Sequence, residues 1–392
     1  MGAHKLRMRK SAVARQIDRY VGILLLCVLK PVKHWVTFED VSDKLLLIKF
    51  AGMGDIILMK PVVDGIKRRS NLRIYFLTSR AMKEVVSYLQ LSNGAIYYID
   101  FATSFSRPLE LVKTILNLRR ERFRVVIDFE QWMRFSSLIS YLCGAPMRYG
   151  FSTAAQFRNS LYTHSVTYSF TQHTLVSFAQ LASLFLGEDI VMESLKGFVG
   201  CISPRQDEVE AMRRMLLAYG WKGDSQPLAI VHPGCGSGGE PRTWVVERYA
   251  QVVRILCDRG VFIVLTGGGD DVEIAKRVFR IAESSSVAFF VGRTSFAQLV
   301  ALVSMANFVL CPNTGIMHLA AALGRPTVAL HGPTNPVQWR PIGEAHRIVQ
   351  SKLPCVPCLR LGHDYRCNDY KCMSAITLEE VLEAIDEICK PW

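Results

Sequence analysis

Two apolar runs that each end in glycines and lead into a helical pattern constrain this chain more than any other feature of its sequence. The first run, Lys44–Phe50, is closed by Ala51–Gly54 and followed by a helical pattern over 55–69. The second run, Leu228–His232, enters the glycine-rich loop Pro233–Gly239. Strand, glycine turn and helix in this order are typical of a parallel sheet covered by helices. The sequence therefore predicts an α/β fold with two doubly wound, Rossmann-like domains.

Further strand patterns support two domains. The first half has them at 73–77, 96–99 and 124–127, and the second half at 261–266, 288–291, 308–311 and 327–330. A chain of 392 residues is also longer than one hydrophobic core usually organises. The expected parts are an N-terminal arm over 1–43, a first domain over 44–200, an interdomain segment over 201–226, a second domain over 227–350, and a Cys-rich segment over 351–392. This last segment ends in a helix over 378–388, which we expect to pack back across the first domain.

The N-terminal arm concentrates the positive charge of the chain. Of the net charge of +13, residues 1–34 hold eight basic residues against the single acid Asp18, a net +7. They also contain the apolar run Val21–Leu29, which binding to nucleic acid does not require. This run is too short to cross a bilayer, which takes about 20 apolar residues. A helix over 11–29 either packs on the protein's own core or lies at an anionic membrane surface, the partner that we expect in place of nucleic acid.

Four of the eleven cysteines stand in one cluster near the C-terminus. Cys355 and Cys358 are separated by two residues, and Cys367 and Cys372 by four, a spacing that suits one structural zinc ion, two local disulfides or four reduced thiols. The other seven are scattered, and several lie in apparent core segments. Since the N-terminal apolar run does not read as an export signal, we expect a reducing compartment, which favours metal over disulfides.

The glycines Gly52 and Gly54 after the first strand resemble part of a dinucleotide-binding turn. The third glycine is missing, however, with Ile57 in its place, and no acid ends the second strand, so an oxidoreductase is disfavoured. Asp55 stands at the start of the following helix, where open α/β sheets form their binding crevice. It is either a helix cap or a carboxylate that accepts the proton of a hydroxyl group.

In the second half, two loops combine features of a phosphate site. The loop Pro233–Gly239 offers backbone amides, with Gly234, Gly236 and Ser237 as candidate contacts, and Arg242 follows as a permanent cation able to bind a diphosphate. Asn313, Thr314, Gly315 and His318 come directly after an apolar strand and begin a helix, whose free amides and dipole favour an anion. Glu273, near the end of the second strand of this half, is a candidate for binding a ribose hydroxyl.

Several of these runs together resemble glycosyltransferase family 9, the ADP-heptose:lipopolysaccharide heptosyltransferases, over 44–388. The run Asn313–Gly324 and the following Gly332-Pro333-Thr334 look like the family's Asp-Thr-Gly-x-x-His-Leu-Ala-Ala-Ala signature with its Gly-Pro-Thr. Gly52–Asp55 is similar to the first-domain motif, and Asp128–Arg134 resembles an Asp-x-Gln-Gly-x-x-Arg stretch. Two features depart from the pattern: Asn313 replaces an aspartate, and the loop over 234–240 is longer.

The resemblance implies a GT-B fold, in which two Rossmann-like domains face a central cleft. It implies Asp55 as the catalytic base, Arg242 at the donor diphosphate, and Arg134, with Gly52 and Gly54, on the acceptor side. It also implies an inverting, metal-independent transfer from a nucleotide-sugar donor, ADP-heptose by preference, with no required cofactor.

Our expected function is transfer of a heptose or related sugar to a lipopolysaccharide-core or other lipid-linked saccharide, on the inner face of a bacterial inner membrane. Two alternatives remain from the sequence. One is a nucleotide-sugar epimerase of the same architecture. The other is a membrane-tethered nucleotide-sugar-binding protein that has lost catalysis, an interpretation suggested by Asn313. Acceptor dependence and turnover separate the three.

Overall fold

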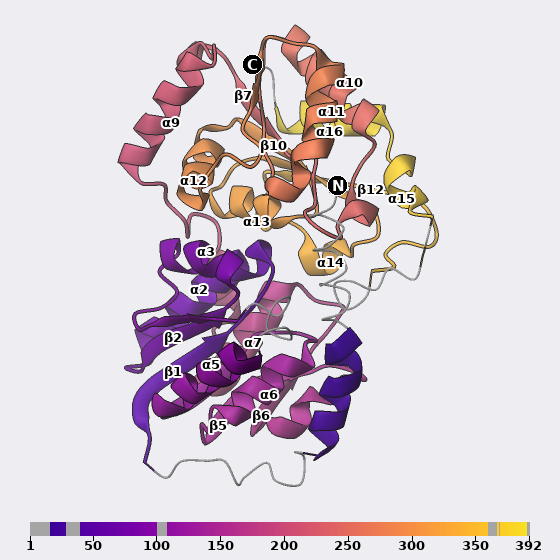
Figure 1. Cartoon of the computed structure of the whole chain (residues 1–392). Helices are drawn as coiled ribbons and strands as arrows, with labels where there is room; N and C mark the ends of the chain where they lie inside the picture. The colour runs from indigo at the N-terminus through magenta and orange to yellow at the C-terminus, as the bar shows by residue number, and fades with distance from the viewer. Residues whose placement is uncertain (1–15, 29–39, 100–107, 360–366, 368, 390–392) are drawn as a thin grey trace. The chain divides into compact units, whose positions relative to one another are not determined.

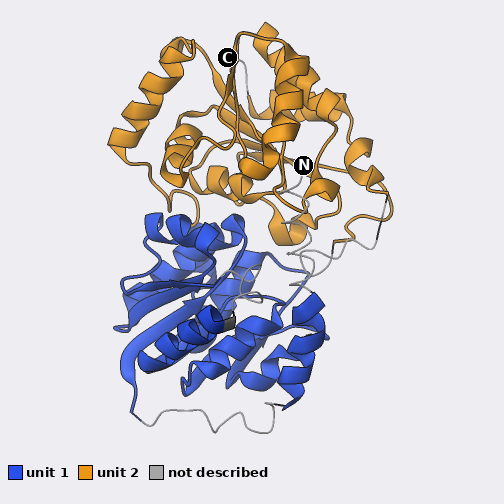
Figure 2. Ribbon diagram, viewed as in Figure 1, with its two compact units in different colours: residues 1–197 blue, residues 198–392 orange. Residues whose placement is uncertain are grey.

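The computed structural model describes residues 16–28, 40–99, 108–359, 367 and 369–389. The chain divides into two compact units, Met1–Gly197 and Phe198–Trp392 (Figure 2). Each unit contains one six-stranded parallel sheet with helices packed on it (Figure 1). The predicted α/β architecture with two Rossmann-like sheets is therefore confirmed.

The sheet of the first unit has the order β3-β2-β1-β4-β5-β6. Its strands are β1 (Ser42–Ile48), β2 (Arg73–Thr78), β3 (Ile96–Tyr98), β4 (Phe123–Asp128), β5 (Met147–Ser152) and β6 (His164–Thr167). The apolar central strands form because both of their faces are covered by helices, and Leu45–Ile48 have no exposed surface. The order reverses between β1 and β4, where Ile48 pairs with Asp128.

The sheet of the second unit has the order β12-β11-β10-β7-β8-β9, which is the same Rossmann pattern. Its strands are β7 (Leu228–Val231), β8 (Phe262–Leu265), β9 (Val287–Phe289), β10 (Phe308–Pro312), β11 (Thr327–His331) and β12 (His346–Gln350). Here the order reverses between β7 and β10, where Val231 pairs with Leu310. Ligands of open α/β sheets bind at the carboxyl ends of the strands at such a reversal, so each unit has one such place.

The helices alternate with the strands along the chain. The first unit has α2 (Met53–Arg69), α3 (Lys83–Tyr88), α5 (Pro108–Arg120), α6 (Arg134–Leu142), α7 (Thr174–Leu186) and α8 (Val191–Lys196), with short 3₁₀ turns η2 (Arg80–Met82) and η3 (Arg158–Leu161). The second has α9 (Gln206–Ala218), α10 (Val246–Asp258), α11 (Val272–Ala282), α12 (Phe296–Met305), α13 (Gly315–Ala322), α14 (Pro336–Trp339), α15 (Lys371–Ala375) and α16 (Leu378–Ile388), with η4 (Gly223–Ser225), η5 (Glu240–Arg242) and η6 (Gly269–Asp271).

The last helix, α16, packs on the core of the second unit. A capping box fixes its start: the Thr377 hydroxyl accepts from the Glu380 N–H, and the Glu380 carboxylate accepts from the Thr377 N–H. Its buried face, with Val381 and Ile385, joins the core formed by α10 and the strands of the second unit. The helix therefore belongs to the core of the second unit, and its packing across the first domain stays a prediction.

The segment that was expected to connect the domains is also part of the second unit. The unit boundary lies between Gly197 and Phe198, and α9 packs on α12. The buried Met212 and Leu216 supply the contact face of α9. An amphipathic helix of this length has an apolar face to bury, and α9 buries it on α12.

Residues 16–28 of the arm form a helix that docks on α6 through one face. Leu26 packs with Leu138, Tyr141 and Leu161, and the Asp18 carboxylate accepts hydrogen bonds from the N–H groups of Arg134 and Phe135 at 3.2 and 2.8 Å. Asp18 thereby caps the N-terminus of α6. Among the described residues, no helix combines the length and the apolar character needed to cross a bilayer. The rest of the expected helix, over 11–15 and at 29, lies outside the described residues.

Candidate active site

Asp55 lies in the first turn of α2, directly after the carboxyl end of β1 and therefore at the strand-order reversal of the first sheet. Gly52 is the N-cap residue of α2, with a φ of 90°, a backbone conformation that favours glycine. No side chain caps this helix start by a hydrogen bond. The Asp55 carboxylate instead binds Lys49: its Oδ2 lies 2.7 Å from the Lys49 Nζ. Asp55 thus stands at the crevice as an ion-paired carboxylate.

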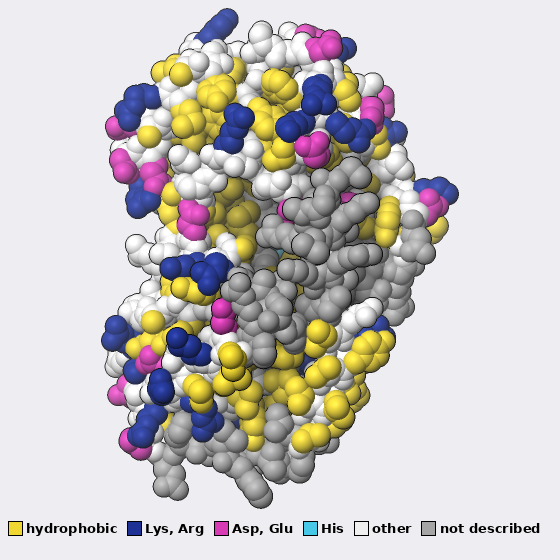
Figure 3. Space-filling view, viewed as in Figure 1, with side chains coloured by type: hydrophobic (Ala, Val, Ile, Leu, Met, Phe, Trp, Pro, Cys, Tyr) yellow, Lys and Arg dark blue, Asp and Glu magenta, His cyan; other side chains and the backbone are white. Residues whose placement is uncertain are grey.

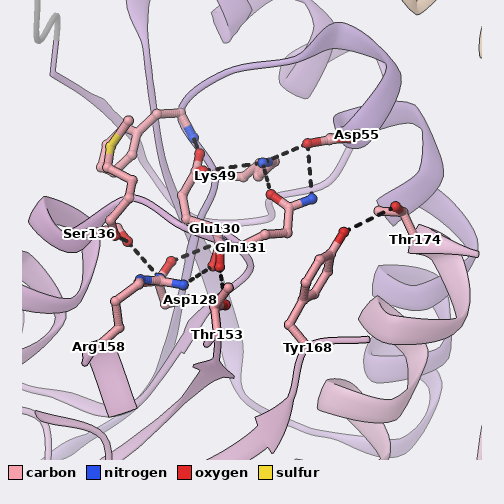
Figure 4. Close-up of polar contacts among 12 residues, drawn as sticks. Lys49, Asp55, Asp128, Glu130, Gln131, Ser136, Thr153, Arg158, Tyr168 and Thr174 are labelled. Carbon is pink, nitrogen blue, oxygen red and sulfur yellow. Dashed lines mark hydrogen bonds and ion pairs between the residues drawn. The ribbon is translucent and has the colours of Figure 1, made fainter. Parts of the chain in front are cut away.

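Lys49 is shared by two carboxylates, Asp55 in α2 and Glu130 in the loop after β4. Besides Asp55, its Nζ contacts Glu130 Oε2 at 3.3 Å and donates to Gln131 Oε1 at 2.8 Å (Figure 4). The Gln131 amide in turn donates to Asp55 Oδ2 at 3.3 Å, and Glu130 Oε1 accepts from the N–H of Phe50 at 2.7 Å. These contacts arise because the register of β1 and β4 places residues 49 and 129–131 at the same edge. Lys49, Glu130 and Gln131 were not predicted from the sequence.

Burial controls the titration of this cluster. Burial raises the pKa of Asp55 above its usual value, the Lys49 ammonium opposes this rise, and the Glu130 carboxylate adds to it. Burial works against the charge of Lys49, but Asp55 and Glu130 together hold the pKa of Lys49 above its usual value. Lys49 therefore stays protonated, whereas Asp55 is a carboxylate with enhanced basicity, a property suited to accepting a proton.

A second buried ion pair lies behind this cluster. Arg158 binds Asp128 at 2.9 Å and donates to the Glu130 carbonyl at 2.6 Å, and both charged side chains are fully buried (Figure 4). The Tyr162 hydroxyl also donates to Asp128, at 2.6 Å. Removing one partner of such a pair leaves an uncompensated buried charge. The pair therefore fixes the backbone that carries Glu130 and Gln131.

Arg134, predicted on the acceptor side, lies at the start of α6 beneath the helix over 16–28. Its Nη2 donates to the carbonyl of Ala155 at 3.1 Å, and its Nη1 lies 3.9 Å from Asp18. A Cβ on Gly22 would lie 3.0 Å from the Arg134 Cβ, so the two elements are in close contact. Gly52 is exposed and Gly54 is buried beside Asp55. The roles of these three residues toward an acceptor stay predictions.

In the second unit, the loop after β7 is held by Asp271, which the sequence did not single out. The Asp271 carboxylate accepts from the N–H groups of Gly236 and Gly268, each at 2.8 Å. A Cβ on Gly234 would lie 2.1 Å from Asp271 Oδ1, so only glycine allows this approach. Gly234 and Gly236 thus shape the loop, and Ser237 is exposed on it.

Arg242 joins this loop to the loop after β10. Its guanidinium donates to the carbonyl of Asn313 at 3.0 Å and to that of Cys235 at 3.4 Å. Its Nε is buried and has no hydrogen-bond partner among the described residues. It also has no carboxylate partner there. Because a partly buried cation gains from a nearby counter-charge, Arg242 suits an anion, and its role at the donor diphosphate stays a prediction.

The helix α13 begins at the same strand-order reversal, after β10. Thr314 is its N-cap residue and Gly315 its first residue, so the first amides of the helix lack intrahelical partners. The Asn313 amide donates to the carbonyl of Trp339 at 3.3 Å and lies 3.5 Å from His331 Nε2. Burial lowers the pKa of His331 to about 4, so this histidine is neutral near pH 7. Arg242, Asn313 and the helix start therefore lie together, and binding of an anion there stays a prediction.

The other two predicted donor residues lie differently. His318 is buried within α13, one turn after Thr314. Glu273 is at the start of α11, where its exposed carboxylate faces Lys276 at 3.3 Å. Among the neighbouring acids it is Asp271 that turns inward. The ribose contact proposed for Glu273 stays a prediction.

The cysteine cluster approaches the loop after β11, where the N–H of Cys358 donates to the carbonyl of Pro333. A Cβ on Gly332, after β11, would lie 2.4 Å from the Met373 sulfur, so the segment around Cys372 approaches the sheet closely. All eleven cysteines are free thiols, and the described residues contain no group of three or more side chains arranged to hold a metal ion. Residues 360–366 lie outside the part of the chain that the structure describes. A structural zinc at Cys355, Cys358, Cys367 and Cys372 stays a prediction, and no chemical step below depends on it.

The chain is similar in sequence to known lipopolysaccharide heptosyltransferases. The chain is 27% identical to lipopolysaccharide heptosyltransferase 3 of Escherichia coli K12, over 86% of this chain and 95% of that protein. It is 31% identical to lipopolysaccharide heptosyltransferase 2 of Salmonella typhimurium, but that match spans 32% of this chain and only 36% of the relative.

The fold has a counterpart among solved structures. An E. coli ADP-heptose lipopolysaccharide heptosyltransferase II superimposes with a TM-score of 0.66, over 88% of this chain and 98% of that one, at 20% identity. This likeness concerns the fold and establishes the expected GT-B class. The model of the family "Glycosyltransferase family 9 (heptosyltransferase)" matches residues 111–368, from α5 to the cysteine cluster. The chain belongs to glycosyltransferase family 9.

Proposed function

We propose that this protein transfers a heptose or a related sugar from a nucleoside-diphosphate donor to a lipopolysaccharide-core or other lipid-linked saccharide. The observation that carries the proposal is that the two strand-order reversals hold complementary groups. One has a buried carboxylate of enhanced basicity, Asp55, and the other has an anion-binding arrangement around Arg242. A base and a leaving-group site are the two requirements of an inverting transfer.

In the first half of the reaction, Asp55 takes the proton of the acceptor hydroxyl. Lys49 and Gln131 fix the carboxylate, since both contact its Oδ2. The hydroxyl oxygen then forms the new bond to the anomeric carbon from the face opposite the diphosphate, so that the configuration inverts. General-base assistance of this kind contributes about 10²–10⁴ in rate.

In the second half, the bond between the anomeric carbon and the diphosphate oxygen breaks and negative charge grows on the leaving group. The Arg242 guanidinium and the first amides of α13 receive this charge, the role that a metal ion has in other transferases. Gly234 and Gly236 allow the loop after β7 to approach the phosphates. ADP-heptose, named for the E. coli structural neighbour, is the donor that we propose to test first. The two half-sites must be brought together in the ternary complex.

An anionic membrane surface is the place where we propose that the acceptor is met. The face of the helix over 16–28 opposite α6 exposes five apolar side chains: Tyr20, Val21, Leu24, Leu25 and Val28. The helix α5, which packs on the other side of α6, exposes Leu109, Val112 and Leu116. Figure 3 shows hydrophobic side chains gathered over this part of the first unit. With the net charge of +7 over residues 1–34, this apolar face suits the interface of an anionic bilayer.

The double substitution Leu24→Ser and Val28→Ser should weaken binding to vesicles of anionic phospholipid by roughly tenfold or more, because burying each apolar side chain contributes about 1.5–3 kcal/mol. Sedimentation with liposomes measures the affinity. Leu217→Ser, at an exposed leucine of α9 in the second unit, is the matched control and should bind as the parent does. Equal binding by the double variant would remove the helix over 16–28 from the membrane contact.

The transferase proposal is tested by following nucleoside-diphosphate release from ADP-heptose and other nucleotide sugars, with and without lipopolysaccharide-core acceptors. Release that depends on the acceptor is the expected result. Donor conversion without acceptor would instead favour the epimerase, and donor binding without turnover would favour a binding protein. The family match favours neither alternative.

A further inference from the structure

The cluster around Asp55 contains a second carboxylate, Glu130, which shares the same ammonium group. Lys49 Nζ lies 2.7 Å from Asp55 Oδ2 and 3.3 Å from Glu130 Oε2. The Glu130 side chain is 4% exposed and the Asp55 side chain 10%. Lys49 therefore divides its one positive charge between two buried carboxylates, of which Asp55 is the more exposed.

The charges around this cluster do not balance. The buried groups at this edge of the first sheet form three sets: Asp55 and Glu130 on Lys49, Asp128 on Arg158, and Asp18 beside Arg134. Together they hold four carboxylates and three basic groups. Each of the last two sets is neutral by itself. In the set on Lys49 two carboxylates share one ammonium group, so one added proton would make that set neutral.

We propose that Glu130 is a positioning residue for catalysis, whose carboxylate competes for Lys49 and thereby makes Asp55 the group that takes up the acceptor's proton. The inference rests on the proposed role of Asp55 as base. Two like charges on one ammonium group disfavour the state in which both are ionised and favour protonation of one of them. Asp55 receives the proton because its side chain is the more exposed of the two, whereas Glu130 also accepts a hydrogen bond from the N–H of Phe50.

This arrangement departs from the motif that the sequence resembles. In the Asp-x-Gln-Gly-x-x-Arg stretch, an uncharged glutamine stands where this chain has Glu130. The substitution Glu130→Gln therefore keeps the shape of the side chain and an oxygen for the Phe50 N–H, and removes only the charge. Its effect on the Asp55 carboxylate is a direct measure of the proposed competition.

The test is the pH dependence of kcat/KM for sugar transfer, which reports the ionisation of the free enzyme. Activity is lost as the pH falls through the pKa of the base. Because removing Glu130's charge lowers the pKa of Asp55, Glu130→Gln should move this acidic limb to lower pH by about one unit. Glu121→Gln is the matched control: it removes a carboxylate paired with Lys44, at the amino ends of the same two strands, and should leave the limb in place.

Two further variants make the result decisive. Glu130→Asp keeps the negative charge and should keep the acidic limb in place. Glu130→Met removes the charge with a side chain of different shape and should shift the limb to lower pH. The methionine variant replaces the glutamine variant as the test if the latter does not fold. An acidic limb that stays in place or moves to higher pH in a folded, uncharged variant overturns the proposal. Turnover retained in Asp55→Asn would instead overturn the role of Asp55 itself, so the two failures are distinguishable.

Discussion

Asp55→Asn should lower the turnover number for sugar transfer by about 10²–10⁴, since an amide cannot accept the acceptor's proton. Binding of the nucleotide-sugar donor should be unchanged, because the residues that we propose to bind it lie in the second unit. The substitution is nearly isosteric, and Lys49 keeps Glu130 as its ion-pair partner, so the fold should be retained. Turnover is measured by acceptor-dependent nucleoside-diphosphate release, and donor affinity by calorimetric titration.

The matched control for this variant is Asp64→Asn in the same helix. Asp64 pairs with Lys60 on α2 and is partly exposed, so the control removes a carboxylate near the site without touching the crevice. It should retain full turnover. If Asp55→Asn also transferred sugar at the parent rate, Asp55 would be a structural ion-pair partner of Lys49 only.

The architecture follows from the sequence to a large extent. Apolar runs closed by glycines identified the central strands, because strands covered on both faces must be apolar along their whole length. The strands β5, β6 and β12 were missed. Their sequences, such as His164–Thr167 and His346–Gln350, are polar, and strands at or near a sheet edge need no continuous apolar run. Periodicity does not identify such strands.

The sequence located the loops that carry the candidate site, but it did not predict the contacts between their side chains. Asp55 and Asn313 follow the ends of the apolar strands β1 and β10, and Arg242 lies in η5, between the loop after β7 and α10. Lys49 left a signal, a lysine at the end of a buried strand. Its partner Glu130 is 81 positions away in the chain, and only the register of β1 and β4 brings the two together. A single sequence contains no information on that register.

The choice between neighbouring acids also required the structure. Glu273 and Asp271 are two positions apart, so on a helix start they point in different directions. Asp271 turns inward to the amides of Gly236 and Gly268, whereas Glu273 faces solvent. The phase of a helix relative to its sheet decides which of two neighbouring acids turns inward.

Arg242→Met should lower the turnover number by about 10²–10³, the cost of removing one preorganised donor to the charge that develops on a leaving group. Arg242→Lys should recover only part of this loss. Lysine restores the charge, but it cannot make the two hydrogen bonds, to the carbonyls of Asn313 and Cys235, that orient the guanidinium.

Arg254→Met is the matched control, since Arg254 also donates to a backbone carbonyl, that of Ile281, but lies on the exposed side of α10. It should leave turnover unchanged. Single-turnover measurements with saturating donor separate chemistry from binding. A rise in the donor's Kd alone, with the rate of transfer intact, would show that Arg242 holds the ground-state diphosphate and does not stabilise its departure. A fall in the rate at saturating donor places its contribution in the transition state, where the leaving group carries its greatest charge.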